Sequence, residues 1–323
     1  MLYISIKIWS HFKMEKSSQN IVLCFVLILA SATIGGCFPS NKEVTNQTIP
    51  WPLQNHPADG EQVSPQAVTH YIHHFAVQLW DRKLDGNNYY GLEVTMDVYG
   101  FYLEREQHSS AAIWIYDKDG GKSPVNGFIL GWHVNPTLYK DSDTHFVTSW
   151  TGNGSPPEGC YNRECPGYVR IGPGISPGDV ISPVSDFMGK RQYITIRASK
   201  DKSSGDWQVY YGFNGPAKLV GYFPKSLFPR LEKNQFGIAF GGFTSHMDTQ
   251  EGPPMGSGFF PGRSAASFYD IKFVDAEGST HSVDKVLPIK ESSPTCYRIS
   301  TIASGGFSYG GPGCLKSKMN TVL

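Results

Sequence analysis

The feature that most constrains the fold of this chain is a period-two alternation of apolar and polar residues, repeated in short segments. In YYGLEVTMDVYG (89–100), every second residue from Leu92 to Val98 is apolar, and the residues between them are polar or charged. Such alternation is typical of a strand with one buried face. The pattern recurs in AAIWIYD (111–117), RQYITIRAS (191–199), DWQVYYG (206–212) and SFYDIKFVD (267–275), where it places Tyr269, Ile271 and Phe273 on one face.

Turn-forming residues separate these segments, and the chain contains 35 glycines and 22 prolines. Many short strands joined by turns favour an all-β fold, an antiparallel β-sandwich or barrel. No repeat of fixed period and no internal boundary divides residues 67–323, which we expect to form a single domain. Residues 224–231 are expected to contain one short helical turn.

The charge balance excludes several classes of partner. The 28 Lys and Arg residues equal the 28 Asp and Glu residues, whereas nucleic-acid binding needs a basic excess or stripe. We therefore expect no nucleic-acid partner. The oligomeric state stays open.

The amino terminus resembles a secretory signal peptide, which we assign to residues 1–36. Three lysines precede an apolar run at 21–34, and the small residues around Ala32 fit a cleavage site. The alternative, a membrane anchor, needs about 20 apolar residues. Residues 37–66 are polar and rich in proline, which indicates a linker. We expect a protein secreted to the extracellular space, cell wall or vacuole, with no membrane association after signal cleavage.

Secretion makes disulfides the expected state of the cysteines outside the signal region. Four cysteines allow three pairings; proximity favours Cys160 with Cys165 and Cys296 with Cys314. A zinc site is disfavoured because no Cys-x-x-Cys occurs. Two sequons, at Asn46 and Asn153, are candidate glycosylation sites.

Short motifs identify no catalytic or cofactor site. On a strand, His73 and His74 would point to opposite faces, so we expect no metal site there. The segment GFSYG (306–310) matches a nucleophile-elbow pattern, but no histidine follows it. We expect neither a cofactor nor a metal.

Longer strings carry a resemblance to a known family. GWHVNPTLY (131–139), GCYNRECPGYV (159–169), VGYFPKSLF (220–228), PPMGSGFFP (253–261) and YGGPG (309–313) occur in this order, with others between them. Together they resemble the plant neprosin domain, over about residues 71–314. The resemblance implies an antiparallel β-sandwich, the two disulfides named above, and a glutamic peptidase that cleaves after proline in acid, using one glutamate as general base and a second to stabilise the oxyanion.

The two glutamates implied by the resemblance are missing from this chain. Aligned on Gly131-Trp132, the first position is Ile129; aligned on Gly241-Gly242, the second is Phe243. We therefore expect a catalytically impaired member. The alternative is an active acid-pH prolyl endopeptidase with a relocated carboxylate, for which Glu251 is the weak candidate, beside Asp248 and Glu158.

The impaired domain is expected to retain a groove for extended, proline-rich chains, because such chains are already ordered when free. Its expected partner is a proline-rich extracellular protein or peptide. Trp132, Trp150 and Tyr222 are candidate groove residues, although core packing is an equal interpretation of each. A further alternative is a structural or cell-wall glycan-binding module. The linker is too short for a folded inhibitory pro-domain, which needs about 40 residues.

Overall fold

The computed structural model describes residues 70–81, 89–117, 126–152, 159–232, 236–283 and 285–315. The signal peptide and linker assigned above lie outside these residues, as do Asn46, Asn153 and Glu158. No helix among the described residues is long and apolar enough to cross a membrane.

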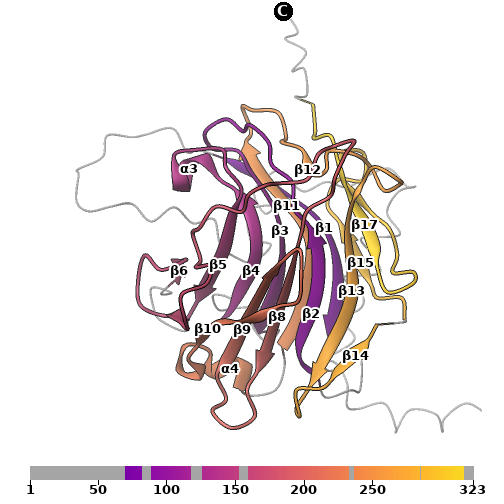
Figure 1. Ribbon diagram of the computed structural model, residues 1–323. Coiled ribbons are helices and arrows are strands. Elements are labelled where there is room, and N and C mark those ends of the chain that lie inside the picture. Colours follow the sequence, from indigo (N-terminus) through magenta and orange to yellow (C-terminus); the bar gives the residue numbers. More distant parts are fainter. Residues whose placement is uncertain are drawn as a thin grey trace, which may run out of the picture. The chain divides into compact units, whose positions relative to one another are not determined.

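The described chain forms two large antiparallel sheets (Figure 1). The seven-stranded sheet has the order β15 (Ile289–Glu291), β1 (Tyr71–Asp81), β11 (Phe236–Met247), β3 (His108–Asp117), β4 (Gly127–Val134), β5 (His145–Thr151), β6 (Gly159–Tyr161).

The ten-stranded sheet has the order β12 (Met255–Gly256), β17 (Phe307–Gly311), β13 (Ala266–Asp275), β2 (Tyr89–Asp97), β8 (Tyr193–Lys200), β9 (Trp207–Phe213), β10 (Lys218–Phe223), β7 (Val169–Arg170). Two further strands extend it, because β14 (Thr280–Ser282) pairs with β13 and β16 (Arg298–Ile299) pairs with β17. The short helices are α3 (Pro136–Tyr139), η2 (Lys225–Leu227) and α4 (Pro229–Glu232). The last two confirm the helical turn expected at 224–231.

One apolar core fills the space between the two sheets and confirms the predicted sandwich. Leu92, Val94 and Met96 of β2 are fully buried in it, as the alternation predicted. Phe128, Leu130 and other core-facing side chains of the seven-stranded sheet pack against them in one cluster.

The expected face of β13 is wrong at one residue. Tyr269 was placed with Ile271 and Phe273, but it is only half-buried, and its neighbour Phe268 is the residue that enters the core. The pairing with β2 shifts register between Tyr269 and Lys272, where Asp270 has φ 52°. A β-bulge of this kind adds one residue and reverses the alternation beyond it.

Both predicted disulfides are confirmed. Cys160 is bonded to Cys165, and Cys296 is bonded to Cys314, with Cα–Cα distances of 6.1 Å and 5.0 Å. The second bond ties the segment after β15 to the residues that follow β17.

Candidate functional site

The two positions at which the resemblance implies glutamates lie on one face of the seven-stranded sheet. Ile129 is on β4 and Phe243 on β11, and β3 lies between these strands. Their neighbours Phe128, Leu130 and Phe240 belong to the core between the sheets. Because side chains alternate along a strand, Ile129 and Phe243 point the other way, onto what we call the outer face of this sheet.

The outer face carries its own apolar cluster, separate from the core. Ile129 lies opposite Trp114 of β3, and Phe243 lies opposite Phe75 of β1. Ile129 and Phe243 are only 6% and 3% exposed. The members of this outer cluster are Val77, Ala112, Trp114, Ile129, Ala239 and Phe243, with Phe75, Leu79 and Tyr116 packed against them. Burial, with a contribution from Asp81 of β1, raises the pKa of Tyr116 to about 12, so a carboxylate lies near the edge of the cluster.

A row of small residues crosses the outer face between the two positions. Gly241 pairs with Ala112, which pairs with Gly131. A side chain at residue 241 is excluded, because its Cβ would collide with the Ala76 carbonyl oxygen and φ is 151°. All three residues of this row are buried.

Histidines surround Phe243 at the end of the outer face. The His73 ring stacks on Phe243 with centroids 5.8 Å apart, and the His108 ring lies 5.3 Å from the same ring. His108 Nε2 is 3.2 Å from Nδ1 of His133. Burial, with a contribution from the neighbouring His73, lowers the pKa of His108 to about 3. Burial also holds the pKa of His133 well below its usual range.

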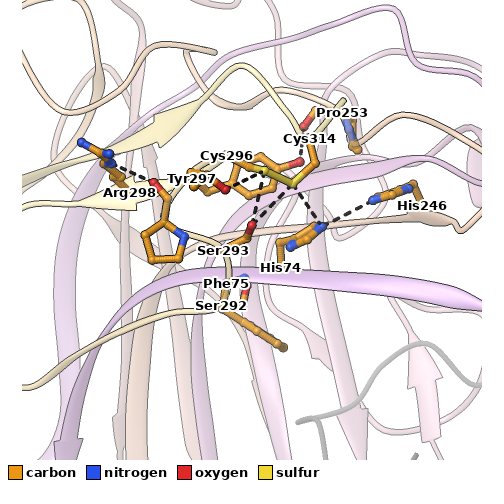
Figure 2. The surroundings of a disulfide bond; sticks show 12 residues. His74, Phe75, His246, Pro253, Ser292, Ser293, Cys296, Tyr297, Arg298 and Cys314 are labelled. Carbon is orange, nitrogen blue, oxygen red and sulfur yellow. Dashed lines mark hydrogen bonds between the residues drawn. A yellow bond between two sulfur atoms is a disulfide. The ribbon is translucent and has the colours of Figure 1, made fainter. Parts of the chain in front are cut away.

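His74 points to the opposite side of β1, as expected for adjacent residues of a strand. Figure 2 shows its ring between the Cys314 sulfur and His246. Its Nε2 is 3.7 Å from Cys314 Sγ and 3.4 Å from His246 Nε2. Burial, with a contribution from His246, lowers the pKa of His74 to about 4. No group of three His, Cys, Asp or Glu side chains in the described parts of the chain is arranged to hold a metal ion.

The tryptophans proposed as groove residues do not lie on the outer face. Trp132 and Trp150 are 0% and 4% exposed and pack in the core between the sheets. Trp132 Nε1 also donates to the Asp97 carbonyl oxygen of β2. Core packing, the other interpretation of these two residues, is therefore the one that their burial supports. Tyr222 is half-buried on β10 of the other sheet.

The carboxylates considered as substitutes lie in loops at the end of β11. Glu251 and Asp248 are both exposed. The backbone carbonyl of Glu251 accepts a hydrogen bond from Gln107 Nε2. The sequence reasoning missed Glu106, whose carboxylate accepts a hydrogen bond from the Tyr71 hydroxyl and lies 3.2 Å from Arg105 Nε. The signal that could have found it is its position two residues before the strand that carries His108.

Comparisons with known proteins find two similar solved structures and one matching family model. Scytalido-glutamic peptidase, solved with a peptide-based transition-state analogue, has 10% sequence identity and a TM-score of 0.37, over 76% of this chain and 99% of that chain. SCP-B, a member of the eqolisin family of peptidases solved with the tripeptide Ala-Ile-His, has 10% identity and a TM-score of 0.32, with the same coverage. The neprosin family model matches residues 105–312, well over half of the sequence. The chain therefore belongs to the neprosin family.

Proposed function

We propose that this protein is a secreted neprosin-type domain that has lost post-proline peptidase activity and binds extended, proline-rich chains on its outer face. The observation that carries the proposal is the outer cluster, in which buried apolar side chains, Ile129 and Phe243, occupy both implied glutamate positions.

Hydrolysis needs a group that activates water and a group that stabilises the oxyanion. A general base contributes about 10²- to 10⁴-fold in rate and must lie within hydrogen-bonding distance of its proton. Hydrocarbon side chains at residues 129 and 243 can serve neither role. Glu251, the candidate substitute, is exposed in a loop and is not a member of the outer cluster.

The same replacements suit the binding of an apolar chain. The half-buried aromatics Phe75 and Tyr116 pack at the border of the outer cluster. Extended proline-rich chains pack against aromatic side chains and lose little entropy on binding, because they are already ordered in solution.

A peptide titration tests this proposal. We would measure the affinity of the secreted domain for a ten-residue polyproline peptide by calorimetry, with a Gly/Ser peptide of equal length as the ligand control. Phe75→Ala is expected to weaken binding about 5- to 10-fold, the effect of removing an aromatic contact at an interface. Tyr222→Ala is the matched control, since Tyr222 is a half-buried aromatic on the other sheet. Absence of polyproline binding, or an equal loss in both variants, would contradict the proposal.

A further inference from the structure

A chain of four hydrogen-bonded side chains runs from Asn162, the residue after β6, to His108 of β3, across the end of the outer face. Asn162 Nδ2 is 2.8 Å from the Tyr139 hydroxyl, which is 2.7 Å from His133 Nε2. His133 Nδ1 is in turn 3.2 Å from His108 Nε2. The His145 ring stacks on Tyr139 at 3.7 Å and holds the phenol in place.

The direction of the first hydrogen bond is fixed by the backbone. The Thr148 N–H donates to Asn162 Oδ1, and a backbone N–H cannot accept. The Asn162 amide is therefore oriented with its NH₂ group toward Tyr139, to which it donates.

This direction carries through the remaining three side chains. The Tyr139 hydroxyl has His133 Nε2 as its only acceptor among the described residues. Tyr139 is half-buried, and a proton on His133 Nε2 would leave its phenol proton without an acceptor among the described residues, so we place the proton of His133 on Nδ1. His133 Nδ1–H then donates to His108 Nε2, which leaves the proton of His108 on Nδ1.

The chain remains in this single protonation state because every member is neutral. Burial raises the pKa of Tyr139, so the phenol keeps its proton. Burial lowers the pKa values of His133 and His108, so each ring carries one proton rather than two.

The chain of hydrogen bonds ends on an unpaired donor. His108 is 7% exposed, and its Nδ1 has no hydrogen-bond partner among the described residues. The ring lies beside Phe243, with His73 on the other side of that phenylalanine. Buried donors without partners are rare in folded proteins and are costly in stability.

We propose that the Nδ1–H group of His108 is the point at which the outer face recognises a backbone carbonyl oxygen of a bound proline-rich chain, once the Phe243 ring turns aside. This inference rests on the proposed function and names the atom that selects the ligand. A proline-rich chain fits because its prolyl residues offer carbonyl acceptors but no N–H groups. Asn162, Tyr139 and His133 act as positioning residues that hold His108 in the donor tautomer.

The test combines a spectroscopic and a binding measurement on the secreted domain. Nitrogen-15 NMR of the histidine side chains should show His108 and His133 as neutral rings protonated on Nδ1. Tyr139→Phe removes the phenol proton that fixes the direction, so His108 should lose the pure Nδ1–H state. Affinity for the polyproline peptide should fall about 5-fold, the equivalent of one hydrogen bond of about 1 kcal/mol.

Tyr297→Phe is the matched control, because Tyr297 is a buried tyrosine whose hydroxyl donates to the Pro253 carbonyl outside this chain of hydrogen bonds. It should leave both the His108 tautomer and the affinity unchanged. The inference is overturned if the protein binds polyproline while His108 is protonated on Nε2, or if the two variants lose affinity equally. In either case the proposed function still stands. Failure of the unmodified protein to bind the peptide overturns both.

Discussion

Lowering the pH from 7 to 5 should destabilise this domain. Three histidines are buried as neutral rings. Burial lowers the pKa of His74 to about 4 and of His108 to about 3, and places that of His133 well below its usual range. In the unfolded chain each has a pKa of about 6.5.

The size of this loss of stability does not depend on the exact pKa of a histidine in the folded protein, provided that this pKa lies below 5. Between pH 6.5 and pH 5 the unfolded chain binds a proton at each histidine that the folded chain does not bind. At about 1.4 kcal/mol per pH unit, His74 and His108 each lower the free energy of unfolding by about 2 kcal/mol at pH 5, and the two together by about 4 kcal/mol. His133 acts in the same direction. The contribution is complete above pH 6.5 and is lost as the pH falls toward the folded pKa values.

Urea denaturation at the two pH values measures this difference. His74→Phe should reduce the difference by about 2 kcal/mol, because one titrating group is removed. Ile238→Val, a buried apolar substitution, should lower stability by about 1 kcal/mol at both pH values and leave the difference unchanged. Equal stability at pH 7 and pH 5, or an unchanged difference in His74→Phe, would refute the reasoning.

Two further predictions concern the scaffold. Replacing Cys296 and Cys314 by serine opens a loop with a sequence separation of 18 and should lower the free energy of unfolding by about 3 kcal/mol, measured as a shift of the urea midpoint; an unchanged midpoint would contradict this. Trp132→Ala should cost about 3–5 kcal/mol, because the indole is fully buried between the sheets. The folded Trp132→Ala protein should bind polyproline with unchanged affinity. A selective loss of affinity would show that Trp132 contributes to binding.

The strands of the ten-stranded sheet were easier to predict, because apolar and polar residues alternate along several of them. In β2 the residues between Leu92 and Val98 include Glu93, which is only half-buried. In β4 every residue is buried, because one side faces the core and the other joins the outer cluster. A strand buried on both faces shows no period of two, so neither its face nor its partner is visible in the sequence.

The candidate site was predictable only within single strands. Counting from Ile129 places His133 on the same face and Trp132 on the opposite one, a signal that the sequence contains. The contact of His133 with His108 depends on the pairing of β4 with β3. Its contact with Tyr139 depends on the position of α3, of which Tyr139 is the last residue. These are long-range consequences of the fold, which no local pattern specifies.

The central claim is the loss of catalysis, and digestion of a proline-rich protein tests it most directly. The purified domain would be incubated with the substrate from acidic to neutral pH, and the products identified by mass spectrometry, with an acid prolyl endopeptidase as the positive control. The account predicts an intact substrate at every pH. Cleavage after proline by the unmodified protein, abolished by Glu251→Gln or Glu106→Gln, would contradict it and identify a relocated carboxylate.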